Sequence, residues 1–246
     1  MECLLALNWK MNKTPSEAAQ WAKLLQEEMP QTDVQVAVMA PHITLPLVAA
    51  EMYGSTAHLG AQDVSPHDWG AYTGETSALQ LKELDVRYVI VGHSERRTYQ
   101  NETDTLVAQK AKKAIEHGII PIVCVGEALE IRNQNEHIAF TLNALQGSLQ
   151  GVDIVHPTDL VIAYEPVWAI GTGKTATPED AEEMSAAIRE FLRERFLNGQ
   201  DVPVLYGGSV NPQNIREICD QANVNGCLVG GASLDLETVF AMVKAL

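Results

Sequence analysis

Short apolar runs alternate with longer amphipathic segments along the whole chain. A short, unbroken apolar run is typical of a strand that is buried on both faces of a parallel sheet. Turn-forming or capping residues bound most of these runs, which separates them from the amphipathic segments. The pattern predicts strands at residues 4–8, 34–39, 58–61, 88–91, 119–125, 160–164, 204–206 and 227–229.

Helix signals occupy the segments between these strands. Thr14-Pro15 and Thr177-Pro178 are each followed by acidic residues, and this order matches an N-cap, a proline at the first helical position and an acidic first turn. Gly118 follows another amphipathic stretch and favours a helix end there. The pattern predicts helices near residues 14–29, 45–52, 103–117, 130–149, 177–197, 214–219 and 236–245.

Strict alternation of strands and helices predicts an α/β fold with a parallel sheet. Repeated strand–helix units in 246 residues favour a closed (β/α)8 barrel, the TIM-barrel fold, over an open doubly wound sheet, which stays the alternative. No linker divides the chain, so we expect residues 1–246 to form a single catalytic domain. Residues 62–77 form the one long irregular segment, and loops of that length inside a compact domain are usually functional.

The charge balance excludes some classes of partner. The chain carries 17 Lys and Arg against 32 Asp and Glu, a formal net charge of −15. We therefore expect neither a nucleic acid nor an anionic membrane as partner, because both would be repelled. A small anionic substrate stays possible, because a few local donors outweigh a distant net charge.

The cysteines and the apolar runs bear on location. Cys3, Cys124, Cys219 and Cys227 form no C-x-x-C pair, which favours reduced, structural thiols in a cytoplasmic protein. The start of the chain lacks the basic region of a signal peptide, and no apolar run is long enough to span a membrane.

Polar residues follow several predicted strands at the point where each ends. Asn8 and Lys10 follow the first strand, His93 and Glu95 the fourth, and Glu165 the sixth. In an α/β barrel these strand ends meet at one mouth, where active sites lie. Each residue alone reads equally well as a surface or loop residue. Together, a carboxylate base, an imidazole and a cation are the set needed to remove a proton next to a carbonyl group.

Glycine-rich turns follow the last two predicted strands, at Gly207-Gly208 and Gly230-Gly231. Such turns let backbone N–H groups approach an anion closely and form the usual phosphate site of these barrels, although they also serve as tight turns. Residues 171–176 match G-x-G-x-x-A, but the helix start lies after the glycines, so we expect no dinucleotide. The histidines are scattered, so we expect no metal, and no cofactor is predicted.

Five segments together resemble the signatures of the triosephosphate isomerase family. They are Asn-Trp-Lys-Met-Asn at 8–12, Val-Gly-His-Ser-Glu-Arg-Arg at 91–97, Ala-Tyr-Glu-Pro-Val-Trp-Ala-Ile-Gly-Thr-Gly at 163–173, Tyr-Gly-Gly-Ser-Val at 206–210 and Leu-Val-Gly-Gly-Ala-Ser-Leu at 228–234. They follow the family order over the whole chain. The resemblance implies a cofactor-independent isomerase that interconverts dihydroxyacetone phosphate and D-glyceraldehyde 3-phosphate through an enediolate.

The resemblance also implies roles for individual residues. Glu165 would move the proton between two carbons, and His93 would polarise the carbonyl and shuttle a proton between the oxygens. Lys10 would stabilise developing negative charge, with Asn8 positioning it and Glu95 supporting Lys10 and His93. Backbone N–H groups of four residues would hold the phosphate: Gly171, Ser209, Gly230 and Gly231.

A lid and a dimer are implied in the same way. The segment bounded by Pro166 and Ala176, with Trp168 and Ile170 inside it, resembles the closing lid of the family, which is a reference case for such gating. Tyr206 and Ser209 would latch the closed lid. Residues 62–77 resemble the loop through which these enzymes form a homodimer, with Thr73 reaching the neighbouring subunit's active site.

The sequence departs from the family pattern before the last strand. Asn225 and Cys227 stand where Asp and Phe are expected, so Arg189 would keep at best a neutral partner and the fold would lose a modest amount of stability. Other readings stay open at this point. They are a sugar-phosphate epimerase or lyase on a similar barrel, a glycosidase that uses Glu95 and Glu165, and an inactive binding protein on the same fold.

Overall fold

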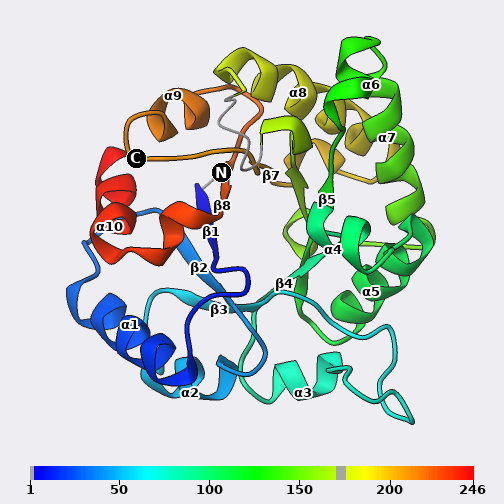
Figure 1. The fold of residues 1–246 in the computed structure, drawn as a ribbon. Coiled ribbons are helices and arrows are strands. Elements are labelled where there is room, and N and C mark those ends of the chain that lie inside the picture. Colours follow the sequence, from blue (N-terminus) through cyan, green and yellow to red (C-terminus); the bar gives the residue numbers. More distant parts are fainter. Residues whose placement is uncertain (1–2, 170–175) are drawn as a thin grey trace.

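The computed structural model describes residues 3–169 and 176–246, whose strands form one closed parallel barrel. Each strand pairs with the next along the sequence, and the last pairs with the first (Figure 1). The predicted (β/α)8 barrel is thereby confirmed, and the alternative of an open sheet is wrong. The strands are β1 (Leu4–Asn8), β2 (Gln35–Ala40), β3 (His58–Ala61), β4 (Tyr88–Val91), β5 (Ile120–Val125), β6 (Val161–Tyr164), β7 (Val204–Tyr206) and β8 (Gly226–Val229).

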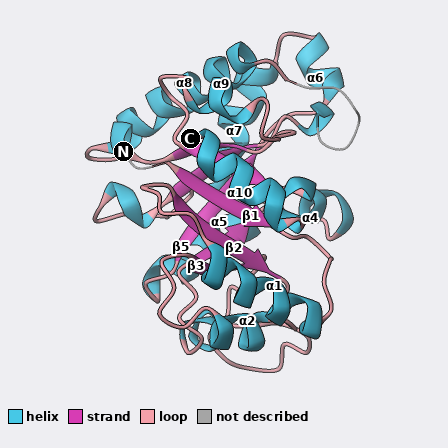
Figure 2. Cartoon of the chain, turned by 90° about the vertical axis from the view of Figure 1, so that its left-hand side faces the viewer, coloured by secondary structure: helices cyan, strands magenta, loops and turns pink. Residues whose placement is uncertain are grey.

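Helices surround the strands and cover the outside of the barrel (Figures 1 and 2). Short 3-10 turns at Pro157–Asp159, Val167–Ala169, Gly199–Asp201 and Gly231–Leu234 complete the connections. The helices are α1 (Pro15–Glu28), α2 (Leu45–Glu51), α3 (Ala78–Lys82), α4 (Ser94–Tyr99), α5 (Asp104–Glu116), α6 (Leu129–Asn133), α7 (His137–Ser148), α8 (Pro178–Arg195), α9 (Ile215–Cys219) and α10 (Leu236–Ala245).

The two Thr-Pro signals begin helices as predicted. Thr14 caps α1, with its backbone N–H donating to the Glu17 carboxylate at 2.8 Å and its hydroxyl accepting from the Glu17 backbone N–H. Thr177 and Asp180 form the same reciprocal pair at the start of α8. Each pair satisfies two backbone N–H donors that a helix start would otherwise leave without a partner.

Three helical regions differ from the prediction. The single helix expected over residues 130–149 is two helices, because Asn135 adopts a left-handed backbone (φ 58°) that interrupts the helix between α6 and α7. α3 and α4 were not predicted. Both are too short to show helical periodicity. Ser77 and Gln80 nevertheless form a capping box at the start of α3, and the Ser-x-x-Gln pattern of this box is visible in the sequence.

The barrel wall separates two apolar layers. Successive side chains of a strand point to opposite faces, so Leu4 and Ala6 of β1 point into the barrel while Leu5 and Leu7 face the helices. The interior is filled by residues from all around the wall: Leu4, Ala6, Ala37, Met39, Tyr88, Ile90, Ile122, Cys124, Val161, Ala163, Leu205 and Leu228.

Asn225 is the partner of Arg189, as expected. Its side-chain oxygen accepts from Arg189 Nη2 at 2.6 Å and from the Val204 backbone N–H at 3.0 Å. Arg189 also donates to the backbone carbonyls of Val202 and Asn223, so it is held by neutral acceptors. Burial accordingly lowers its pKa from the usual value.

Within the described residues, none of the helices combines the length and apolarity needed to cross a membrane.

Candidate active site

The alternation that fills the barrel also selects the side chains at its mouth. In β6, Val161 and Ala163 point inward, so Glu165 is the next inward position and lies at the carboxyl end of the strand. In β1 the inward series Leu4 and Ala6 continues to Asn8. The strand period therefore places two predicted site residues on the same edge.

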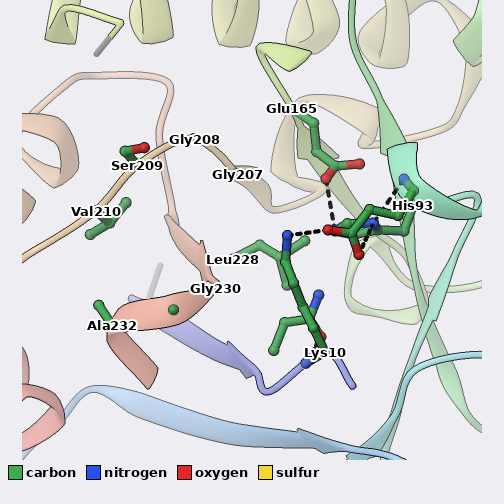
Figure 3. Close-up of a pocket in the computed structure, with 13 residues that line it drawn as sticks. Lys10, His93, Glu165, Gly207, Gly208, Ser209, Val210, Leu228, Gly230 and Ala232 are labelled. Carbon is green, nitrogen blue, oxygen red and sulfur yellow. Dashed lines mark hydrogen bonds and ion pairs between the residues drawn. The ribbon is translucent and has the colours of Figure 1, made fainter. Parts of the chain in front are cut away.

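These positions enclose a cavity of about 430 Å³ at the carboxyl ends of the strands. Glu165 and His93 lie on one side of it, Lys10 crosses the middle, and the glycine-rich turns lie opposite (Figure 3). The predicted residues that the structure brings together here are therefore those of the catalytic set and the phosphate turns. The cavity is lined by Asn8, Lys10, His93, Glu95, Glu165, Gly207, Gly208, Ser209, Val210, Leu228, Gly230, Gly231 and Ala232.

The Glu165 carboxylate is almost completely buried and hydrogen-bonded on both oxygens. Its Oε2 accepts from the Ser94 backbone N–H at 2.9 Å, and its Oε1 lies 3.2 Å from the Ser94 hydroxyl and 3.0 Å from His93 Nε2. Burial alone would raise the pKa of Glu165, but His93 and the two Ser94 hydrogen bonds outweigh it and hold that pKa below the usual value. The carboxylate is therefore ionised at neutral pH, as a general base must be.

His93 is positioned by the start of α4. It is the N-cap of that helix, and its Nδ1 accepts a hydrogen bond from the Glu95 backbone N–H at 3.2 Å. An Nδ1 that accepts leaves the ring proton of the neutral imidazole on Nε2, which faces Glu165 and the cavity. Burial lowers the pKa of His93, but the nearby Glu165 and Glu95 carboxylates raise it above the usual value in this arrangement.

We favour the neutral imidazole as the reactive form of His93. A proton on Nδ1 would point at the Glu95 N–H, so Nδ1 could no longer accept the hydrogen bond that this N–H donates. Glu165 contributes the largest of the influences that raise the pKa of His93. Once the Glu165 carboxylate turns toward a substrate, Glu95 is the carboxylate that still raises the pKa of His93. Burial and the positive charge of Lys10 lower that pKa and so oppose protonation.

Lys10 is held in an uncommon backbone conformation. Its φ is 53°, in the left-handed region that non-glycine residues seldom adopt. Asn8 Oδ1 accepts from the Lys10 backbone N–H at 3.0 Å, and Gln62 Nε2 donates to the Lys10 carbonyl at 2.9 Å and to the Met39 carbonyl at 2.9 Å. These contacts fix the backbone on both sides of Lys10, which offsets the local strain.

Glu95 lies between Lys10 and His93 at the mouth. Its Oε1 lies 2.5 Å from Lys10 Nζ, and its Oε2 lies 3.6 Å from His93 Nδ1. The first contact is an ion pair, while the second is too long for a hydrogen bond. The predicted support of Lys10 by Glu95 is thus a direct contact, and its influence on His93 is electrostatic.

The lid residues that the structure describes are anchored away from the cavity. Trp168 Nε1 donates to Glu127 Oε1 at 2.9 Å, and the Arg132 guanidinium stacks 5.2 Å from the Trp168 ring. Pro166 and Ala176 lie at the two ends of the predicted lid, and Ala176 is buried. Ile170 and Gly171, which were predicted to belong to the lid and to the phosphate site, lie outside the described residues.

The two predicted latch residues differ in their contacts. Ser209 Oγ donates to the Ala169 carbonyl at 3.0 Å, so it already contacts the lid. The Tyr206 hydroxyl is buried and has no hydrogen-bond partner within residues 3–169 and 176–246. Burial also raises the pKa of Tyr206, so the hydroxyl stays a neutral donor.

Sequence reasoning missed three residues that shape the site. Ser94 binds Glu165, Gln62 holds the Lys10 carbonyl, and Glu127 accepts from both Trp168 and the Tyr164 hydroxyl, the latter at 3.0 Å. All three were within reach of the rule used for the other strands, because Gln62 follows β3, Ser94 follows β4 and Glu127 follows β5 at the same edge of the barrel. The sequence does not show which partner each of them contacts, because these partners lie in other segments.

The similarity of this chain to known proteins extends over nearly its whole length. The sequence model of the triosephosphate isomerase family matches residues 3–246. A triosephosphate isomerase of Deinococcus radiodurans is 55% identical over 248 residues, covering 100% of both chains. One of Thermus thermophilus is 54% identical over 243 residues, covering 98% of this chain and 97% of its own. One of Mycobacterium tuberculosis is 48% identical over 250 residues, covering 99% and 95%.

Proposed function

Because the chain belongs to the triosephosphate isomerase family, we propose that Glu165, His93 and Lys10 carry out the interconversion of dihydroxyacetone phosphate and D-glyceraldehyde 3-phosphate. The chain is an isomerase of this class. The observation that supports these three roles is the geometry of the residues at the mouth of the barrel. An ionised carboxylate lies 3.0 Å from an imidazole, and an ammonium group faces both across one cavity.

Glu165 is the base that removes the proton from one substrate carbon and returns it to the next. Its carboxylate is ionised, and a side chain at the neighbouring Gly207 would bring a Cβ to 3.0 Å from the Glu165 Cγ, so glycine at that position leaves room for the Glu165 side chain. To act, the carboxylate exchanges the Ser94 hydrogen bonds for contact with the substrate carbon. Desolvation by the bound substrate then strengthens it as a base.

His93 serves the oxygens while Glu165 serves the carbons. With its proton on Nε2, the neutral imidazole donates to the carbonyl oxygen and stabilises the enediolate as it forms. The same nitrogen can pass its proton to one oxygen and recover a proton from the other, which completes the transfer between ketone and aldehyde without an external acid.

Lys10 supplies a positive charge that stabilises the negative charge of the enediolate as it forms, and the negative charge of the bound phosphate. Its ammonium lies between Glu95 and the turn at Gly230, where a built Cβ would lie 3.4 Å from the Lys10 Cε. The absence of a side chain at that turn leaves room for a phosphate beside the ammonium. Backbone N–H groups of Ser209, Gly230 and Gly231 complete this phosphate site, together with Gly171 from the lid.

The segment from Pro166 to Ala176 closes over the bound substrate. An enediolate with a neighbouring phosphate can eliminate that phosphate, and a lid that excludes water and holds the phosphate suppresses the loss. The hydroxyl of Tyr206, which is buried and has no hydrogen-bond partner among the described residues, is available to bind the lid in its closed position, and Ser209 already contacts its first half. Opening and closing then gate substrate entry and product release.

The protein works as a homodimer through residues 62–77. In Figure 1 this segment, between β3 and α3, projects from the body of the barrel. A groove of about 390 Å³ beside Lys10 is bordered by Met11 and Tyr99, whose side chains are 96% and 75% exposed. Such exposed apolar side chains next to the mouth suit a partner's loop tip carrying Thr73. Sedimentation that gave an active monomer would contradict this assembly.

The cytoplasmic location and the single-domain organisation of residues 1–246 stay predictions. The first rests on the unpaired thiols and the second on the absence of a linker in the sequence.

One assay tests the proposed roles. Isomerisation of glyceraldehyde 3-phosphate is measured in chelated buffer without added cofactor for the wild type, Glu165→Gln and Glu194→Gln. The last variant removes an exposed carboxylate of α8 and serves as the matched control. We expect Glu165→Gln to lose about 10²–10⁴-fold in kcat, the range for loss of a general base, with the control unchanged. Equal activity in Glu165→Gln and wild type would mean that the base is assigned wrongly.

A further inference from the structure

Three of the four cysteines meet at the end of the barrel opposite the cavity. Cys3 immediately precedes β1, Cys219 is the last residue of α9, and Cys227 is the second residue of β8. The Sγ atoms of Cys3 and Cys219 are 4.0 Å apart, and those of Cys219 and Cys227 are 3.7 Å apart. Because the cluster lies at the amino ends of the strands, it is remote from the catalytic mouth.

Cys219 is the central member, since it contacts both of the others. All of these thiols are free, and both Sγ–Sγ separations are longer than the disulfide bond length of about 2.05 Å. We propose that Cys3 and Cys219 are an oxidative modification site, at which a hydroperoxide converts the two thiols into a disulfide that joins the start of the chain to α9.

Accessibility and mobility favour Cys3 over Cys227 as the partner of Cys219. Cys3 and Cys219 are both partly exposed, whereas Cys227 has no exposed surface. Cys227 is also fixed in the barrel wall, with Leu5 opposite it on one side and Tyr206 on the other. Any backbone shift at Cys227 would therefore disturb strand pairing on both sides, whereas Cys3 precedes its strand.

The reaction balances with the hydroperoxide as the only oxidant. The thiolate of Cys219 attacks the terminal oxygen of the peroxide, the O–O bond breaks, and the second oxygen leaves as water or an alcohol. This step oxidises the sulfur to a sulfenic acid. The Cys3 thiol then attacks the sulfenic sulfur, an S–S bond forms, and the hydroxyl leaves with the thiol proton as water. Two electrons pass from the two sulfurs to the peroxide.

The surroundings make this reaction slow. The hydrogen bond to Cys219 and burial raise the pKa of Cys3 far above its usual range, and the contact with Cys227 raises that of Cys219. The thiolate fraction at neutral pH is therefore small, and thiolate is the reacting species. The site consequently responds to sustained exposure to peroxide, and long incubation at mildly alkaline pH is the condition for the test.

The disulfide would act on stability and leave the catalytic mouth untouched. It would cross the seam at which β8 pairs with β1 and closes the barrel, and it would link residues 216 positions apart in the sequence. A cross-link over such a long loop removes many conformations from the unfolded chain. Oxidised protein should therefore unfold at a higher temperature than reduced protein, with equal isomerase activity.

The pairing can be read from a tryptic digest of peroxide-treated, folded protein under non-reducing conditions. Cys3 lies in the peptide of residues 1–10, while Cys219 and Cys227 share the peptide of residues 217–244. A bond to Cys3 therefore joins two peptides, and a bond between the other two cysteines lies inside one peptide. The variant Cys227→Ser distinguishes the two possible partners of Cys3, and the buried Cys124 serves as an internal control that stays reduced.

We expect the joined peptides in the wild type and in Cys227→Ser, and none in Cys3→Ser or Cys219→Ser. The Tm of oxidised wild type should rise by about 5 °C or more and return on addition of a thiol reductant. A bond found only inside the peptide of residues 217–244 would overturn the proposal, as would four reduced thiols after treatment. Because Cys3 is partly exposed, Cys3→Ser should fold normally, which keeps the test valid even if Cys219→Ser does not.

Discussion

Two groups of charged side chains lie next to each other in this barrel and differ in what their charges face. At the mouth, Lys10 and Glu95 form an ion pair that borders the open cavity. Behind it, Lys110 is buried between Glu102 and Asp63, at 2.5 and 2.6 Å. The first group leaves its charges within reach of a substrate, and the second encloses Lys110 and Glu102 almost completely.

The same two segments supply both groups. Gln62 holds the Lys10 carbonyl, and the next residue, Asp63, binds Lys110. Glu95 pairs with Lys10, and the next residue, Arg96, pairs with Asp63 at 2.7 Å and with Glu102 at 2.6 Å. Neighbouring residues thus point to opposite groups, so the enclosed charges fix the backbone that carries the catalytic ones.

The pKa directions reflect this difference. Burial raises the pKa of Asp63 despite its cationic neighbours, whereas Lys110 and Arg96 outweigh burial at Glu102 and lower its pKa. The enclosed group therefore stays intact only while its cations are present. We infer that the enclosed group serves stability and the open group serves catalysis, and three experiments test that division.

Removing Lys110 should have the largest effect on stability. Lys110→Met leaves two buried carboxylates against Arg96 alone, and breaking a buried ion pair from one side typically costs about 3–5 kcal/mol. The free energy of unfolding is measured by denaturant titration, with kcat measured on the folded protein. Lys112→Met, which removes an exposed lysine of the same helix, is the control. A stable Lys110→Met variant that had lost its activity would reverse the assignment.

Removing Lys10 should have the opposite outcome. Lys10→Met eliminates the ammonium that stabilises developing negative charge, so kcat should fall by about 10²–10³-fold. Its ion pair with Glu95 is partly exposed and contributes little to folding, so stability should change by at most about 1 kcal/mol. Steady-state kinetics and denaturant titration on one sample decide the matter. A large loss of stability with normal kcat would place Lys10 in the structural group.

The smallest effect should appear in the pH dependence of stability. Because the folded protein lowers the pKa of Glu165, its contribution to stability is fully present above the unfolded value of 4.5 and is lost as pH falls through the lowered folded value. Glu165→Gln removes this titration. Between roughly pH 5 and pH 3, the stability of the variant should fall less steeply than that of the wild type. Parallel curves would show that folding does not lower the pKa of Glu165.

Much of this architecture could be predicted because its signals are local. Apolar runs predicted the strands, and Thr-Pro pairs predicted the starts of α1 and α8. The placement of the candidate catalytic residues at one mouth could be predicted because barrel strands end at one edge, so position in the sequence translates into position at the mouth. The contacts of Ser94 with Glu165 and of Gln62 with Lys10 could not be predicted, because each joins segments far apart in the sequence. The interruption at Asn135 follows from one backbone angle.

The inward series of β6 has a further consequence. Val161, Ala163 and Glu165 are successive rungs of one ladder, so the base is the uppermost layer of the packed interior. Any change that shifts β6 in its register would displace the packing and the reaction together. Helices α1, α5 and α8 contribute no residue to the cavity lining, whereas Glu95 of α4 lies in it. A designer could therefore alter the exposed faces of those three helices, provided the strand ends, their connections at the mouth and α4 are left in place.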